Sequence, residues 1–245
     1  MAQKKIQGAF QPIVANWLKP GQPGYDGFGG WLTAEQLRAH YEQNYYGYFD
    51  KLNKLATKDS KLAAMTKMDA MLSSYQVNDD VFHNAAQIVN HEIFWNCITP
   101  HKSFITAQPA ADRQVRQRIN EVVPEDLLAE IESSFGSFNN FITEFNSKSE
   151  KHFASGWTWL VWASQDNDQN GNQSSEQPGG LLIFDTPDAY CPYVDGYTPI
   201  LVLDLWEHAY YLDYEAQRKA YINNFWQYVD WMHVGKRFRM ALQQQ

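Results

Sequence analysis

Apolar and aromatic residues recur at helical spacing early in the chain. They lie at Leu37, Tyr41, Tyr45, Tyr48, Leu52 and Leu55. A separation of three or four residues places such side chains on one face of an α-helix. Thr33 is a suitable N-cap for this helix, and Gln36 stands three residues later in the position of a capping box. The pattern therefore predicts a long amphipathic helix that begins just after Thr33.

Three further helices are predicted from their end signals. They cover about residues 78–98, 124–136 and 137–153. Asn78 and Ser137 are favourable N-caps. Pro124 suits the first turn of a helix, and Gly136 suits a C-cap. The first 150 residues are thus predicted to be mainly helical.

The pattern changes to that of strands after about residue 155. The segments 156–162, 181–184 and 200–203 are rich in strand-forming residues. A polar loop with no apolar side chain occupies 165–180, and helical periodicity returns from Trp206. This order predicts an α+β protein.

The same order suggests a division of the chain. We expect an extended Gly- and Pro-rich arm over residues 1–30 and a helical domain, an α-hairpin, over 31–110. A C-terminal α/β domain with a small three-stranded antiparallel sheet should follow over 111–245, with the boundary near 102–122.

The composition is that of a globular protein, with 44% hydrophobic and 15% aromatic residues. No apolar stretch approaches the roughly 20 residues that span a bilayer, and the N-terminal segment lacks the apolar region of a secretory signal. Cys97 and Cys191 fall in unrelated contexts and are expected to be free thiols in a reducing compartment. We expect the cytoplasm, or an organelle after removal of a targeting peptide.

The net charge of −8 disfavours general nucleic-acid binding. The same charge repels small anions at long range, so a site for an anionic substrate needs positive residues nearby.

A candidate for metal chemistry follows the last predicted strand. Asp204 ends the apolar run, and His208 comes four residues later. The two side chains can offer two kinds of metal ligand to one point. The alternative is a helix-capping Asp near a core His, because short motifs also match by chance.

Four segments of the chain together resemble the iron/manganese superoxide dismutase family over about residues 30–240. They are Ala39-His40-Tyr41 with Tyr48 and Leu52-Asn53-Lys54-Leu55; Phe82 to His91 and Phe94 to Cys97; Phe135 to Phe138 with Ser155 to Val161; and Asp204 to Tyr211. As a set, these motifs are highly specific.

The resemblance implies four metal ligands: His40, His91, Asp204 and His208. Three imidazoles and one carboxylate suit a transition metal and leave a position for solvent or a small anion. His83, His101, His152 and His233 match no ligand position and are expected to be surface or packing residues.

The resemblance also implies residues around the metal. Tyr48 matches the family's gateway tyrosine, and Gln87 matches the glutamine that hydrogen-bonds to solvent at the metal. Trp157 and Trp206 match the aromatic wall, with plain core packing as the alternative, and Arg218 matches an arginine of the substrate funnel.

The origin of the glutamine implies the metal. Iron members typically carry it in the second helix, as in Ala85-Ala86-Gln87. Manganese members supply it between the last two strands, where this chain has Ala189. The resemblance therefore implies an iron enzyme, with manganese as the alternative metal. It would convert superoxide into dioxygen and hydrogen peroxide by redox cycling of one ion.

The family's quaternary structure implies a homodimer through Glu207 and Tyr211; a solvated Glu207 in a first helical turn is the alternative. One departure lies near that surface, because Asn44 stands where the family usually has His.

A second departure is the long polar loop at 165–180. Its Asp166, Asp168, Asn170 and Gly171 imitate the start of a calcium loop, but Gln177 replaces the closing Glu. Two other functions stay open: a non-enzymatic structural subunit of a larger assembly, and a metal enzyme of another class, such as a dioxygenase.

Overall fold

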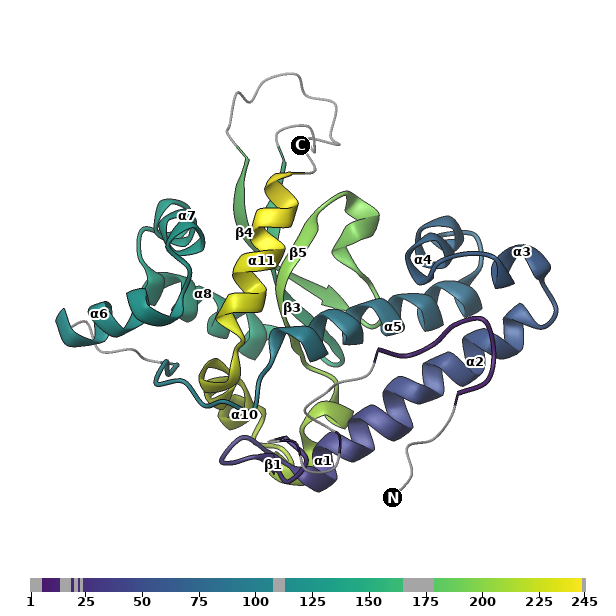
Figure 1. Ribbon diagram of the computed structural model, residues 1–245, viewed down its shortest axis with the longest axis horizontal. Helices are drawn as coiled ribbons and strands as arrows, with labels where there is room; N and C mark the ends of the chain where they lie inside the picture. The colour runs from purple at the N-terminus through teal and green to yellow at the C-terminus, as the bar shows by residue number, and fades with distance from the viewer. Residues whose placement is uncertain are drawn as a thin grey trace.

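The computed structural model describes residues 6–13, 19, 22, 24–107, 113–164 and 179–243. Its N-terminal part is a helical hairpin (Figure 1). α1 (Ala34–Arg38), a π-helical segment (Ala39–Tyr45) and α2 (Tyr46–Ala56) form one continuous helix. α3 (Ser60–Ala63) and α4 (Lys67–Ser74) follow, and α5 (Asp79–Cys97) returns against α2.

The remaining elements build the C-terminal domain. Its helices are α6 (Arg113–Val122), α7 (Glu125–Phe135), α8 (Phe138–Lys151), α9 (Tyr211–Tyr214), α10 (Arg218–Phe225) and α11 (Trp231–Leu242). Its strands are β3 (Gly156–Ala163), β4 (Gly180–Pro187) and β5 (Thr198–Asp204). A separate short pair, β1 (Gly27–Phe28) and β2 (Leu32–Thr33), precedes α1. The predicted α+β organisation is confirmed.

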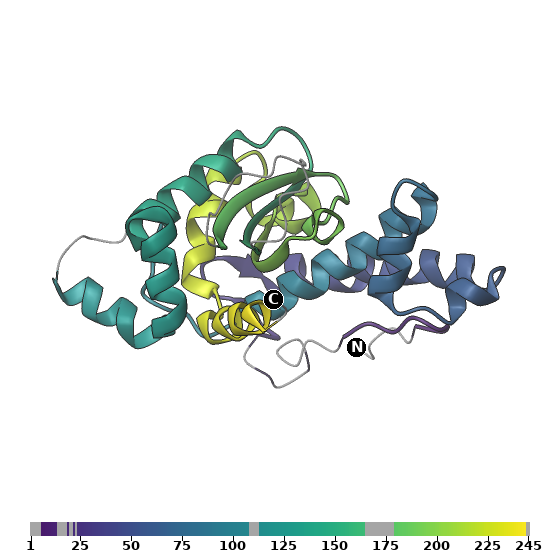
Figure 2. The same cartoon turned by 90° about the horizontal axis from the view of Figure 1, so that it is seen from above.

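The three-stranded sheet has the order β4-β3-β5, and both pairings are antiparallel. The register shifts at Leu160/Val161, where β3 passes Pro199, which has no N–H to donate. Helix α8 packs on β3 and β4, whereas α11 and α5 pack on β5 (Figures 1 and 2). The contact between α5 and β5 joins the hairpin to the sheet.

The predicted caps are present. The side chains of Thr33, Asn78 and Ser137 each accept a hydrogen bond from the backbone N–H three residues later. Gly136 ends α7 with a φ of 77°, a left-handed conformation that glycine adopts without strain. Local side-chain chemistry therefore marks the ends of these helices.

The predicted capping-box role of Gln36 is wrong. Its amide donates to the backbone oxygen of His208 (2.7 Å) and accepts from the N–H of Leu212 (3.0 Å). The side chain is buried at the contact between α1 and the 207–212 segment. A tertiary partner has displaced the local one, and the result is a direct link between hairpin and C-terminal domain.

Other differences concern short elements. The region after Trp206 is not one helix but two 3₁₀ turns, at Glu207–Ala209 and Trp226–Tyr228, between α9, α10 and α11. α3, α4 and α6 were not predicted, and α6 lies within the expected domain boundary. The loop residues 165–178, including the calcium-loop imitation, lie outside the described residues. Among the described helices, none combines the length and apolarity needed to cross a membrane.

The described part of the N-terminal arm lies along the hairpin (Figure 1). Ile6 and Phe10 are buried. Asn53 holds the arm by accepting from the N–H of Phe10 (2.8 Å) and donating to its carbonyl oxygen (2.9 Å). Gly8 has a φ of 134°, and a Cβ there would lie 2.3 Å from Asn53, so the position favours glycine.

Candidate metal centre

Four side chains from separate elements converge inside the protein. His40 lies in the π-helical segment, His91 in α5, Asp204 at the end of β5, and His208 in the following 3₁₀ turn. Their donor atoms all lie within 4.8 Å of one another. Oδ2 of Asp204 is 3.2, 3.6 and 3.4 Å from Nε2 of His40, His91 and His208, respectively. The four predicted ligands are therefore neighbours in space.

The two oxygens of Asp204 face different partners. Oδ1 accepts a hydrogen bond from the backbone N–H of Trp206 (2.8 Å), as a capping residue would. Oδ2 faces the three imidazoles and has no hydrogen-bond partner. The capping and ligand interpretations of Asp204 thus apply to different oxygens of one carboxylate.

The atoms that face the centre are buried and unsatisfied. Nε2 of His40, His91 and His208 has no hydrogen-bond partner, and neither has Oδ2 of Asp204. Nδ1 of His91 donates to the backbone oxygen of Gln87 (2.6 Å), which leaves the lone pair of Nε2 for the centre. Buried polar atoms without partners are costly. One metal ion would satisfy all four donors, so the residues fit a transition metal.

The ionisation states also suit a metal. Burial is the main cause that lowers the pKa of His40 from 6.5 to about 4. Burial likewise lowers the pKa of His91. Burial alone would raise the pKa of Asp204, but its contacts with His208 and His40 outweigh burial and lower it. At neutral pH, His40 and His91 are therefore neutral and Asp204 is an anion, the forms that bind a cation.

Gln87 and Tyr48 lie beside these donors. Gln87 is buried in α5 one turn before His91, and its Oε1 has no hydrogen-bond partner. The Tyr48 ring centre is 5.4 Å from that of His91. Burial and then the negative charge of Asp204 raise the pKa of the Tyr48 hydroxyl. Tyr48 therefore keeps its proton at neutral pH.

Two indole rings line the centre and share an acceptor. The ring centre of Trp157 is 5.0 Å from that of His91, and the Trp206 ring stacks on His208 at 5.4 Å. Both indole N–H groups donate to the backbone oxygen of Asp188, at 2.9 and 3.1 Å. Sequence reasoning missed Asp188 because a backbone carbonyl leaves no signal in residue type.

The residue that follows Asp188 bears on the choice of metal. Ala189 is buried, and Asn90 of α5 donates to its carbonyl oxygen at 3.2 Å. Its methyl group offers no hydrogen bond to the centre. The glutamine closest to His91 in sequence is Gln87, one turn before it in α5.

The residues expected at a subunit interface surround a groove of about 870 Å³. Glu207, Tyr211 and Asn44 all line it. The side chain of Tyr211 is 48% exposed, and Glu207 is exposed as well. Gln36 lies in the same groove and holds the backbone of the 207–212 segment. His208 also lines the groove, so the groove adjoins the candidate metal centre.

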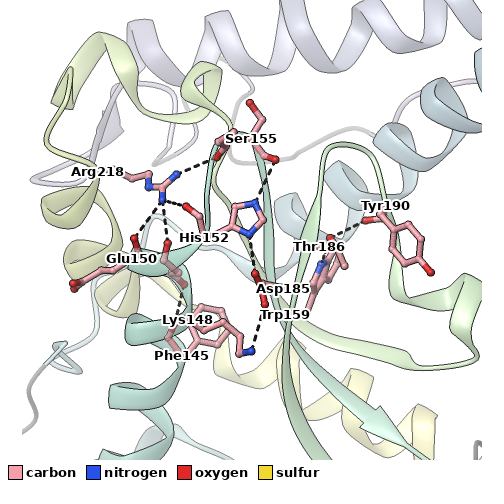
Figure 3. A network of polar contacts seen from close by, with 12 residues as sticks. Phe145, Lys148, Glu150, His152, Ser155, Trp159, Asp185, Thr186, Tyr190 and Arg218 are labelled. Atoms are coloured by element: carbon pink, nitrogen blue, oxygen red, sulfur yellow. Dashed lines mark hydrogen bonds and ion pairs between the residues drawn. The ribbon is translucent and has the colours of Figure 1, made fainter.

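The guanidinium of Arg218, the arginine expected in the substrate funnel, is hydrogen-bonded to the protein backbone. It donates to the backbone oxygen of His152 at the C-terminal end of α8 (Figure 3). It also donates to the backbone oxygen of Ala154, just beyond the helix (3.1 Å). A cation is favourable at this end of a helix dipole. The role of Arg218 toward an anionic substrate stays a prediction.

The other histidines lie apart from the centre. Nδ1 of His152 lies 2.9 Å from Oδ2 of Asp185, and Nε2 lies 3.3 Å from the backbone oxygen of Ser155, which can only accept. Within the described ranges, the one group of His, Cys, Asp and Glu side chains close enough to hold a metal is the set around Asp204.

Comparisons with known proteins identify one family. The family of iron/manganese superoxide dismutases matches twice: its alpha-hairpin domain over residues 24–99 and its C-terminal domain over residues 123–237. Superoxide dismutase [Fe] of Photobacterium leiognathi is 35% identical over 92% of this chain and 94% of its own length. The chloroplastic superoxide dismutase [Fe] 2 of Arabidopsis thaliana is 34% identical over 92% and 70%, respectively. Superoxide dismutase [Mn] 3 of Leptolyngbya boryana is 32% identical over 87% and 79%.

Proposed function

The chain belongs to the iron/manganese superoxide dismutase family, and from this premise we propose that His40, His91, Asp204 and His208 bind one iron ion. The protein is a superoxide dismutase, an oxidoreductase that converts superoxide into dioxygen and hydrogen peroxide. When bound, the metal would provide the redox centre that accepts an electron from one superoxide and passes it to a second, which becomes hydrogen peroxide with two protons. The observation that carries the ligand proposal is the set of four buried donor atoms without hydrogen-bond partners.

The protein residues around the donors control protons and access. Gln87 presents a buried, unpartnered Oε1 that can accept a hydrogen bond from a solvent molecule. Tyr48 keeps its hydroxyl proton and can donate it in a hydrogen bond to an anion. We propose that Gln87 biases the metal potential through such bonds and that Tyr48 orders the proton supply. Trp157 and Trp206 restrict water around the histidines.

Gln87→Ala separates these roles from metal binding. The variant should keep the metal, because Gln87 holds His91 through its backbone oxygen rather than its side chain. Its activity and reduction potential should change. Loss of the metal with the fold intact would show that the Gln87 side chain acts in binding instead. Asn84→Ala, at a half-buried position of the same helix, is the matched control.

Iron is the proposed metal, with manganese as the alternative. The position of Gln87 in α5 and the methyl group at Ala189 support iron. Relatives named for iron support it too, although a relative named for manganese is also similar. The test is to load metal-free protein with each metal and to measure metal content and superoxide dismutation. Activity with manganese but not iron would overturn the choice.

A homodimer through Glu207 and Tyr211 is the proposed assembly. The exposed groove that contains both residues beside His208 supports it. Light scattering should give twice the chain mass. Glu207→Ala should weaken the dimer, whereas Glu215→Ala, another exposed glutamate outside the groove, should not.

The non-enzymatic alternative is not favoured, because such a subunit needs no metal donors and this chain keeps four. A dioxygenase is not favoured, because its usual three protein ligands leave more coordination positions open than the four donors of this chain would. We also propose the helical domain over 31–110 and the C-terminal domain over 111–245. The family's separate matches to 24–99 and 123–237 support that division.

We propose the cytoplasm, or an organelle after removal of a targeting peptide, as the compartment. Cys97 and Cys191 are buried free thiols, which suit a reducing environment. Cell fractionation with an antibody against the protein tests this proposal.

A further inference from the structure

A second set of polar residues lies behind His91. Tyr45, fully buried in the π-helical segment, stacks on the His91 ring with ring centres 5.9 Å apart and planes 25° apart. Its hydroxyl donates to Oε1 of Glu92 (3.1 Å) and accepts from the backbone N–H of Ile13 (3.0 Å). Tyr45 therefore connects the His91 ring to a carboxylate and to the N-terminal arm.

Glu92 is the residue after His91 and forms an ion pair with Lys67 of α4. The side chains of Glu92 and Lys67 are only 17% and 26% exposed. Burial raises the pKa of Glu92, and the contact with Lys67 opposes that rise. A poorly solvated pair of this kind is neutral as a whole, but each partner alone would leave a buried charge.

The arm covers this pair. The ammonium group of Lys67 also donates to the backbone oxygen of Gln11 (3.2 Å). The hydroxyl of Tyr41 donates to the backbone oxygen of Ile13 (2.5 Å). The arm thus limits solvent around the pair, and a charge in such surroundings acts over a longer distance than it would in water.

We propose that Tyr45, Glu92 and Lys67, covered by the arm, are positioning residues for the His91 ring. By keeping the net charge behind that ring at zero, they also set the reduction potential of the metal. The inference rests on the proposed function, since it requires a redox-active metal at His91. It assigns a role to residues that neither bind the metal nor contact the substrate.

The two halves of the pair should shift the potential in opposite directions. Lys67→Met leaves the carboxylate of Glu92 uncompensated, and a negative charge favours the more highly charged, oxidised metal. Its potential should therefore fall. Glu92→Gln leaves the ammonium group uncompensated, so its potential should rise. The double variant removes both charges and should return close to wild type.

The measurement is a redox titration of the iron-loaded proteins, followed by electron paramagnetic resonance. Lys61→Met is the matched control, because Lys61 lies in the neighbouring helix α3 but is exposed, and its potential should equal that of wild type. Shifts of the same sign in both single variants would mean that loosened packing, not charge, acts on the metal and would overturn the proposal. So would unchanged potentials.

Two further measurements keep the test decisive. Tyr45→Phe retains the ring but removes the hydroxyl, and it should alter the iron spectrum without altering the iron content. If Lys67→Met does not fold, Glu92→Gln and the double variant decide, because only a charge effect is reversed by removing the second charge. Iron content is measured first. Wild-type protein that binds no iron would overturn the proposed function and this inference together, whereas iron-loaded variants with unchanged potentials overturn this inference alone.

Discussion

Two aspartates of the C-terminal domain contact histidines in opposite ways. At Asp185, His152 lies 2.9 Å away, and its second ring nitrogen contacts the Ser155 carbonyl (Figure 3). At Asp204, three imidazoles approach one oxygen at 3.2 to 3.6 Å, and none of the facing atoms has a hydrogen-bond partner. Residue types are the same, but only the second cluster leaves its donors unsatisfied.

The difference shows how a site can be told from a structural contact. A protein that only needs to hold two elements together satisfies its polar atoms, as His152 and Asp185 do between α8 and β4. Buried donors that converge without partners are costly for the folded chain alone. Their persistence is explained by something that they bind.

Asp204→Asn should produce the largest effect. The amide oxygen can still accept from the N–H of Trp206, so the fold should persist. The amide NH₂ can instead face the imidazoles, where it cannot act as an anionic ligand. Metal content and dismutation should fall by more than the roughly 10- to 100-fold typical of residues that support a ligand. Asp185→Asn is the control, and equal metal loss in both would erase the distinction between the clusters.

The second-largest effect should be a loss of stability when the metal-free protein is acidified. The pKa of His40 is lowered from 6.5 to about 4, so between these values the unfolded chain binds a proton that the folded chain excludes. The free energy of unfolding should fall as pH decreases from 6.5 toward 4, and this group should have no effect above that window. Denaturant titrations at several pH values measure it. His40→Gln should flatten the profile, and an equally steep profile in that variant would assign the effect to other groups.

Asp185→Asn should have a smaller effect, and on stability only. The substitution removes a charge that His152 and Lys148 both contact, with Asp185 about one-third exposed. The expected loss is roughly 1 kcal/mol of unfolding free energy. Thermal unfolding of the iron-loaded protein measures the loss, and dismutation should be unchanged. A changed reduction potential would show that this network reaches the metal.

Lys219→Met should have the smallest effect. Its ion pair with Glu150 (3.1 Å) is at the surface, where such pairs contribute at most about 1 kcal/mol. Unfolding free energy should change by less than in Asp185→Asn, and the difference should shrink in high salt. If Lys219→Met lost more unfolding free energy than Asp185→Asn, burial would not explain the difference between the two ion pairs.

Sequence patterns predicted the parts of the fold that depend on local chemistry. The caps Thr33, Asn78 and Ser137 and the three strands follow from residue types that act within a few positions. Helices α3, α4 and α6 were missed, although Thr66 and Asp69 form a capping box at the start of α4 that was readable. Resemblance to a family, not spacing, selected the candidate ligands.

The rest depends on tertiary contacts that spacing cannot express. Gln36 has the correct place for a capping box but bonds to His208, more than 170 positions away. Both indoles donate to the backbone carbonyl of Asp188. Every residue type has this group, so the residue type gives no signal of the contact. Tyr45, Glu92 and Lys67 each follow an ordinary helical pattern, and only the folded chain brings them together behind His91.

The split origin of the four donors has a consequence for folding in the cell. His40 and His91 come from the hairpin, whereas Asp204 and His208 come from the C-terminal domain. An ion held by all four cross-links distant parts of the chain, much as a disulfide does, and stabilises only the state in which both halves have docked. A half-assembled chain offers too few donors to retain the ion. With the four donors as the proposed ligands, the metal is retained only after both halves have docked, so redox chemistry should begin only in molecules whose assembly is complete.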